Sequence, residues 1–230
     1  MAEYIVDSKD LNAVANAIRE KAESDEQLTF PSEFVSAIGG ISTGTSATEP
    51  YMEETYDARG NLTNVVLHGY TKIRKFAFYD CKKLTLTSLP SGLTSIGERA
   101  FYYCTNLALT SLPNGLTYLD YYAFQGCTNL ALTSLPNGIV GIPSGVFQNC
   151  TNLALTSLPS KIRSISYGAF KGCTGLTSIT FEGTPTTISS DVFTGCINLT
   201  SIKVPWAEGA VANAPWGATN ATITYNYTGG

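Results

Sequence analysis

The chain has 230 residues, of which 43% are hydrophobic and only 14% are charged, against about 25% charged residues in an average globular domain. A net charge of −4 and a single histidine exclude the clustered basic surface of a nucleic-acid-binding protein. No run of about 18 apolar residues is present, so no membrane insertion is expected. The composition therefore predicts a folded domain with a polar, weakly charged surface.

Residues 1–40 are predicted to form a two-helix segment. Leu11, Val14, Ala15 and Ile18 follow the spacing of an amphipathic helix, and a second helix is expected from Pro31, a favoured first helical position. Two such helices are too small to be stable alone. We expect them to pack on a partner, on the rest of the chain or on each other, which would allow oligomerisation.

Two further segments precede the repeats. Residues 41–50 are small and polar and read as a linker. Residues 51–65 are predicted to form a β-hairpin that leads into the repeats described next, with its turn around Gly60.

Six repeats of 23 residues occupy residues 66–205. Each contains one cysteine, a phenylalanine three residues before it and a leucine three residues after it; the cysteines are Cys81, Cys104, Cys127, Cys150, Cys173 and Cys196. A fixed period of this length predicts a solenoid, because one coil cannot bury its apolar side chains without its neighbours. We expect phenylalanine and cysteine columns inside the stack.

Each coil is expected to supply one strand of a parallel sheet, as in Leu93–Ile96 and Leu116–Leu119. The Ala-Phe-x-x-Cys segment is expected to form a short helical or 3₁₀ turn. A second leucine follows in repeats one to four, at Leu86, Leu109, Leu132 and Leu155. The pattern leaves open whether the backbone bulges at these leucines or whether they line a second face.

The pattern Leu-x-x-Ile-x-x-x-Ala-Phe-x-x-Cys-x-x-Leu resembles the BspA-like, treponemal-type leucine-rich repeat over about residues 66–205. The resemblance implies a β-rich solenoid, a right-handed leucine-rich-repeat superhelix that serves binding or adhesion and not catalysis. Residues 206–230 then read as a C-terminal β cap. Trp206 and Trp216 could instead be sugar platforms, but solenoids need end caps, which favours the cap.

Both ends of the chain are similar to tail-associated structural proteins of phages that infect gut Gram-positive bacteria. The segments concerned are Leu28–Ile38, after the first helix, and Val204–Tyr225. This resemblance implies attachment to virion proteins through the N-terminal helices. Met1–Asp7 show no Sec signal peptide, so a cytoplasmic location until assembly or release, including a virion-associated one, is the expectation.

Catalysis and metal binding are not expected. No Cys-x-x-Cys pair is present, and buried thiols are favoured over a disulfide ladder because no export signal is visible. His68 is the only imidazole and lies at a strand end, where a solvated role is favoured over a triad. Asp120 is the only charged residue between Arg99 and Lys161, so the middle coils hold no carboxylate pair. No enzyme, cofactor or metal is therefore predicted.

Six tyrosines in the first three repeats are the candidate ligand-binding residues: Tyr79, Tyr102, Tyr103, Tyr118, Tyr121 and Tyr122. Tyrosine offers flat apolar area and a hydroxyl at low entropic cost, although rings that merely cover the outer turn are an equally good explanation. A basic cluster in the first repeat is more simply explained by protection of the sheet end. The favoured function is a non-catalytic binding or adhesion module for a protein or glycan on a cell surface; the alternative is a phage-tail assembly element.

Overall fold

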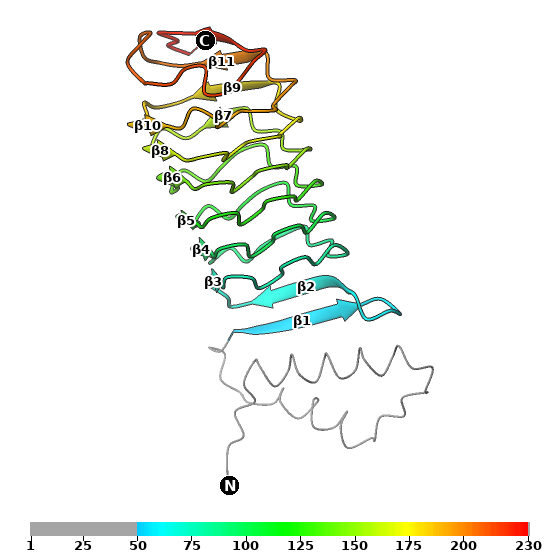
Figure 1. The fold of residues 1–230 in the computed structure, drawn as a ribbon. Coiled ribbons are helices and arrows are strands. Elements are labelled where there is room, and N and C mark those ends of the chain that lie inside the picture. Colours follow the sequence, from blue (N-terminus) through cyan, green and yellow to red (C-terminus); the bar gives the residue numbers. More distant parts are fainter. Residues whose placement is uncertain (1–49, 230) are drawn as a thin grey trace, which may run out of the picture. The chain divides into compact units, whose positions relative to one another are not determined.

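A computed structural model describes residues 50–229, which form a β-solenoid of about seven turns (Figure 1). The two helices expected in residues 1–40 and the linker lie outside the described residues. Within residues 50–229 no segment is helical, and so none could cross a membrane as an apolar helix.

The solenoid begins with an antiparallel pair, β1 (Tyr51–Tyr56) and β2 (Leu62–His68), joined by a turn in which Gly60 has a φ of 76°. One short strand per coil follows along the first edge of the stack. These strands are β3 (Lys72–Ile73), β4 (Ser95–Ile96), β5 (Tyr118–Leu119), β6 (Gly141–Ile142), β8 (Ser164–Ile165) and β10 (Thr187–Ile188). They pair in parallel as two separate three-stranded sheets, β3-β4-β5 and β6-β8-β10, where the sequence predicted one continuous sheet.

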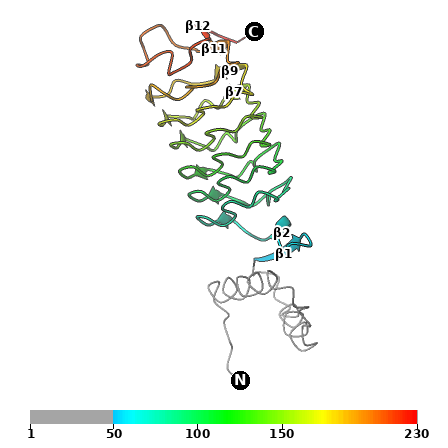
Figure 2. The same cartoon turned by 45° about the vertical axis from the view of Figure 1, so that its right-hand side comes forward.

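A second sheet lies along another edge in the later coils only. It contains β7 (Ser157–Leu158), β9 (Ser178–Phe181), β11 (Ser201–Lys203) and β12 (Thr222–Thr224). In Figure 2 these strands follow one another towards the C-terminal end of the stack. The four leucines whose place was open, Leu86, Leu109, Leu132 and Leu155, are all at most 4% exposed. They line the core along this second edge.

The predicted short helical turns are wrong: the Ala-Phe-x-x-Cys segments are non-helical turns. Their backbone N–H groups alternate between two kinds of acceptor. The N–H of Phe78 donates to the carbonyl of Ala100 in the next coil, whereas the N–H of Tyr79 donates within the turn to Phe76. Because every second N–H donates to a carbonyl of the next coil, the continuous series of hydrogen bonds within the segment that defines a helix cannot form.

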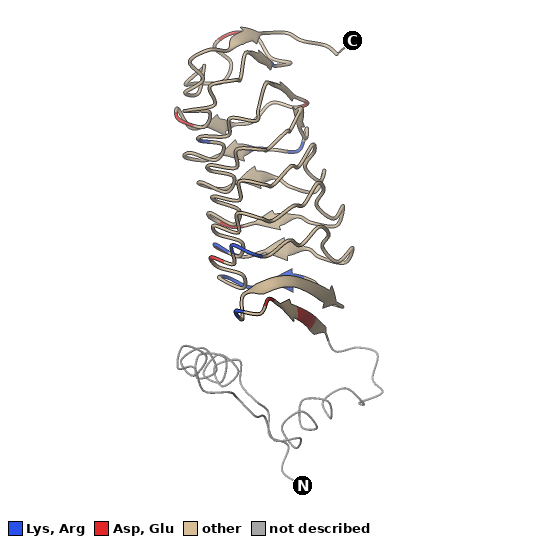
Figure 3. Cartoon of the chain, turned by 90° about the vertical axis from the view of Figure 1, so that its right-hand side faces the viewer, with Lys and Arg blue, Asp and Glu red and all other residues tan. Residues whose placement is uncertain are grey.

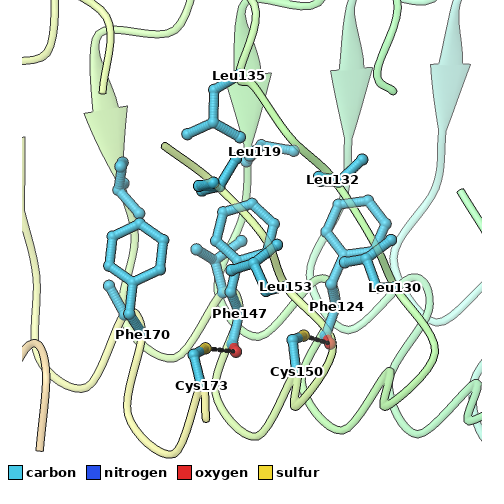
Figure 4. Packing of buried hydrophobic residues seen from close by; sticks show 14 of the residues in the cluster. Leu119, Phe124, Leu130, Leu132, Leu135, Phe147, Cys150, Leu153, Phe170 and Cys173 are labelled. Carbon is cyan, nitrogen blue, oxygen red and sulfur yellow. Dashed lines mark hydrogen bonds between the residues drawn. The ribbon is translucent and has the colours of Figure 1, made fainter. Parts of the chain in front are cut away.

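The interior contains the two predicted columns (Figure 4). Neighbouring phenylalanine rings, from Phe78 to Phe193, stack at centroid distances of 5.2–5.8 Å and within 15° of parallel. Each cysteine after the first donates its thiol proton to a phenylalanine carbonyl of the preceding coil, as Cys150 does to Phe124 at 3.0 Å and Cys173 to Phe147 at 2.9 Å. The cysteine thus serves each coil both as a small apolar side chain and as a hydrogen-bond donor.

The stack has about seven turns where six coils were predicted, because one further turn follows the last cysteine. Trp216 comes 23 residues after Phe193, and the Phe193 N–H donates to the Trp216 carbonyl at 2.8 Å. The Trp216 side chain is fully buried and packs with Trp206 and Phe181. Neither indole face is open to a sugar, so both tryptophans belong to the core of the C-terminal end.

Candidate functional site

The six candidate tyrosines divide between two places in the solenoid. Four of them, Tyr79, Tyr102, Tyr103 and Tyr122, lie in the turns that follow the β3, β4 and β5 strands. Tyr118 and Tyr121 instead line a hollow beside β5, on the strand face. The sequence grouped all six as one surface, whereas Tyr79 and Tyr102 line one hollow, Tyr118 and Tyr121 line another, and the two hollows share no residue.

The first place is a cluster of aromatic rings around one guanidinium, which we term the turn-edge cluster; its members are Phe76, Tyr79, Arg99, Tyr102, Tyr103 and Tyr122. The rings of Tyr79 and Tyr102 stack at 4.9 Å and 7°. Tyr103 lies at 4.6 Å from Tyr102, tilted by 56°. The stacked pair holds a continuous apolar surface, while their hydroxyls remain available to a partner.

Arg99 supplies the positive charge of this cluster. Its guanidinium lies 4.9 Å from the Tyr122 ring centroid and about 6 Å from the Phe76 and Tyr102 centroids, within reach of cation–π attraction. It also pairs with the carboxylate of Glu98, so the cluster is close to neutral. Burial raises the pKa of the Tyr102 hydroxyl, which therefore stays protonated and able to donate a hydrogen bond.

The backbone under the cluster is strained. Phe76, Arg99 and Tyr122 occupy equivalent positions in successive coils, with φ values of 59°, 49° and 58°. The next two coils place Gly145 and Gly168 at this position. Left-handed φ values are costly for residues with a Cβ, so the first three coils carry bulky side chains at a position where the fourth and fifth coils carry glycine.

A second left-handed position shows the same contrast. Asp80 and Tyr103 occupy it in the first two coils, with φ values of 59° and 55°, and Gly126, Asn149 and Gly172 follow. The Tyr103 ring lies directly over Gly126, where an added Cβ would meet ring carbons at 3.1 Å. Sequence reasoning missed Phe76 and Arg99 as site residues; the signal was that they stand 69 and 46 residues before Gly145, at the same position of the 23-residue repeat.

Other groups offer little chemistry within residues 50–229. No group of three metal-ligating side chains is present in this part of the chain. His68 stacks on Tyr51 at 4.2 Å and lies 3.2 Å from the Glu53 carboxylate. Both contacts are made to β1 of the hairpin. No disulfide joins the cysteines of residues 50–229, and burial raises the pKa of Cys127, Cys150 and Cys173 well above the ordinary value. Such thiols are poor nucleophiles and poor metal ligands.

Charges gather at the first coils, and the middle of the solenoid is almost bare of them (Figure 3). The basic residues there are Lys72, Arg74, Lys75, Lys82 and Lys83. Lys82 pairs with Asp80 at 3.2 Å.

Residues 53–155 match the model of a BspA-type leucine-rich repeat region, in six copies. Residues 53–155 are thus repeats of this type. The 23-residue period continues beyond the matched segment to Cys196. Leucine-rich repeats of this kind are generally non-catalytic binding modules.

Two solved structures of leucine-rich repeat proteins share the fold. A leucine-rich repeat protein of Treponema pallidum is 26% identical with a TM-score of 0.51; the alignment covers 67% of this chain and 82% of that protein. A leucine-rich cell surface protein of Faecalibacterium prausnitzii is 30% identical with a TM-score of 0.54 and covers 59% of this chain. This chain spans only 37% of that second protein. No curated protein matches the chain.

Proposed function

We propose that the chain is a non-catalytic binding module and that the turn-edge cluster is where a protein or glycan partner on a cell surface makes contact. The observation that carries this proposal is the strain under the cluster. Left-handed residues with a Cβ cost on the order of 1–3 kcal/mol each. Phe76, Arg99 and Tyr103 all adopt this conformation, although glycine or asparagine does so at the same positions in later coils.

Stability alone does not explain these bulky residues. A solenoid coil of this family closes with Gly145 or Gly168 at the first left-handed position, without strain. Strained backbone that the surrounding structure tolerates is concentrated at functional sites in proteins. The rings are also unusually exposed, with Tyr79 at 47% and Phe76 at 44%, as suits a recognition surface.

A similar protein lies at a cell surface, and this supports a binding role at such a surface. The Faecalibacterium prausnitzii relative is described as a cell surface protein, and the family generally serves binding. The alternative, an assembly element of a phage tail, depends on residues 1–40, which lie outside the described residues. No phage protein is among the relatives reported above, so the surface-binding function has the better support.

The test is a double substitution that replaces two residues of the cluster with those found at the equivalent positions of a later coil. Tyr103→Asn with Tyr122→Gly installs the residues that Asn149 and Gly145 supply at the equivalent positions. We expect the free energy of unfolding to change by less than about 1 kcal/mol, because relieved strain offsets the lost ring contacts. Binding of the full chain to arrays of purified glycans and bacterial or host surface proteins should fall at least about tenfold.

The matched control is Tyr167→Ser, which removes an equally large ring, 60% exposed, from a later coil outside the cluster. This control should bind as the unmodified chain does. Array binding that survives the double substitution would contradict the proposal. Binding to purified virion tail proteins that is lost only on deletion of residues 1–40 would favour the assembly function instead.

A further inference from the structure

The ladder of strands along the first edge is interrupted between the third and fourth coils. The N–H of Asp120 donates to the Ile96 carbonyl at 3.0 Å, and the N–H of Ser166 donates to the Ile142 carbonyl at 2.9 Å. The residue at this position of the fourth coil is Pro143, which has no N–H to offer the Leu119 carbonyl. Consequently β5 and β6 belong to different sheets.

The coils nevertheless stay joined elsewhere. At the turn edge the N–H of Phe124 donates to the Val146 carbonyl at 3.0 Å, and at the second edge the N–H of Ala131 donates to the Leu109 carbonyl at 3.1 Å. The interruption therefore affects the strand face alone. It leaves a hollow of about 240 Å³ there, which we term the strand-face hollow.

The walls of this hollow combine two exposed aromatic rings with a few polar groups. Tyr118 and Tyr121 are each 54% exposed. Ser164 and Ser166 supply hydroxyls from the β8 coil, and Asp120 supplies a carboxylate. The floor is open because Gly141 lacks a side chain: a Cβ there would come within 3.1 Å of the Ser164 hydroxyl.

The charges of the hollow select against anions. Asp120 is its only ionisable group other than the tyrosines, and no lysine or arginine lines it. One oxygen of the Asp120 carboxylate accepts the Tyr121 N–H at 2.8 Å. Burial, followed by the nearby Asp120 charge, raises the pKa of Tyr118. Near neutral pH the hollow thus offers a carboxylate acceptor, a backbone carbonyl and hydroxyls that both donate and accept.

From this arrangement we infer that the strand-face hollow is a binding site for one ring of a neutral glycan. The apolar face of a sugar ring packs on an aromatic surface such as Tyr121, and its hydroxyls satisfy convergent acceptors such as Asp120 and the Leu119 carbonyl. The volume is below the range of about 300–1,000 Å³ that holds a drug-sized ligand, so the site takes a single ring of a longer chain. No lining residue belongs to the turn-edge cluster, so this site stands even if that cluster binds nothing.

The experiment titrates the full chain with neutral methyl glycosides of glucose, galactose, mannose and N-acetylglucosamine, followed by saturation-transfer NMR and tyrosine fluorescence. Glucuronic acid is the charged comparison. We expect at least one neutral glycoside to bind and glucuronic acid to bind more weakly. Tyr121→Ser should weaken binding about tenfold, which corresponds to about 1.4 kcal/mol, because the sugar ring loses the aromatic surface on which it packs.

Two further variants and one control sharpen the test. Gly141→Val fills the floor and should abolish binding, and Asp120→Asn should weaken it while keeping an acceptor for the Tyr121 N–H. Tyr167→Ser is the matched control, because Tyr167 occupies the position of Tyr121 two coils later and does not line the hollow. It should leave the affinity unchanged.

The inference is overturned if no neutral glycoside binds, if glucuronic acid binds more tightly, or if Tyr121→Ser and Tyr167→Ser have equal effects. It is also overturned if the strand-face variants impair binding of a surface protein and of no sugar. Failure of the turn-edge proposal has a different signature, since Tyr103→Asn with Tyr122→Gly would then leave array binding intact while Tyr121→Ser still acts on the glycosides.

Discussion

Each buried cysteine contributes in two ways to the stability of the solenoid. Its sulfur fills space between coils, and its proton bonds to a carbonyl one coil earlier, as Cys196 does to Phe170 at 3.0 Å. Only the protonated thiol can donate this bond. Burial raises the pKa of Cys196 to about 11, and it also raises the pKa of Cys127 well above its ordinary value. The free energy of unfolding should therefore decrease at alkaline pH.

We predict that the free energy of unfolding falls as the pH rises above about 9. Thiols of the unfolded chain lose their protons near their ordinary pKa of 9.0, whereas the folded chain keeps that of Cys196 until about pH 11. The unfolded state then binds fewer protons, so each buried thiol lowers stability by up to about 1.4 kcal/mol per pH unit. Urea unfolding between pH 7.5 and 11 measures the slope.

Cys196→Ala is the control for this dependence. The substitution lowers the free energy of unfolding at every pH because packing is lost. The dependence of this free energy on pH between 9 and 11 should, however, be less steep than in the unmodified chain, because one buried thiol no longer contributes to it. Tyrosine ionisation is common to both proteins and cancels in the comparison. An identical slope in the two proteins would show that Cys196 is not protected from ionisation by the fold.

At the scale of the element, the turn is defined by its left-handed positions more than by the Ala-Phe-x-x-Cys motif. The phenylalanine-to-cysteine spacing of three residues correctly predicted that both side chains point inward, but it also suggested a helix. A helix requires right-handed φ values throughout, and Asn149 and Gly172 interrupt the turn with φ values of 60° and 73°. Because asparagine and glycine tolerate this region, their recurrence at one position was the signal for a turn.

We predict that Gly172→Ala destabilises the protein by about 1–2 kcal/mol. Alanine at a left-handed position costs about that amount, and the new Cβ would also fall 2.3 Å from the Asn149 amide oxygen, which must move. Gly92→Ala is the control, since Gly92 has an ordinary φ and open space around its Cα. It should be neutral or slightly stabilising. Thermal or urea unfolding compares the two, and equal effects would contradict the role of the left-handed turn.

The strand-face hollow shows the limit of prediction from a repeat. The 23-residue period fixes which residues share a column, so the phenylalanine, cysteine and leucine columns followed from spacing alone. The hollow depends instead on one departure from the column, Pro143 in place of a residue with an N–H. Its effect is exerted on Leu119, 24 residues earlier in the chain, so it becomes visible only when the coils are placed side by side.

At the scale of the whole solenoid, stability passes from coil to coil through nearest-neighbour contacts. Sequence reasoning counted six coils by their cysteines and so could not see a seventh turn, which keeps the aromatic position as Trp216 but has no cysteine. The terminal turn matters because the last complete coil would otherwise present unpaired backbone and an exposed phenylalanine column. The Phe193 N–H and ring are both covered by this turn.

We predict that Trp216→Ala loosens the C-terminal coils first. Truncation of a fully buried tryptophan costs about 3–5 kcal/mol, and in a one-dimensional stack that loss acts mainly on the adjacent coil. Hydrogen exchange should therefore accelerate strongly at the Phe193 amide, which donates to Trp216, and little at the Phe124 amide, which donates to Val146 in the middle of the stack. Tyr225→Ala, a partly buried ring at the same end, should have a smaller effect. Equal acceleration at Phe124 and Phe193 would mean that the solenoid unfolds as a single cooperative unit, in which case the terminal turn stabilises all coils alike and does not act as a local cap.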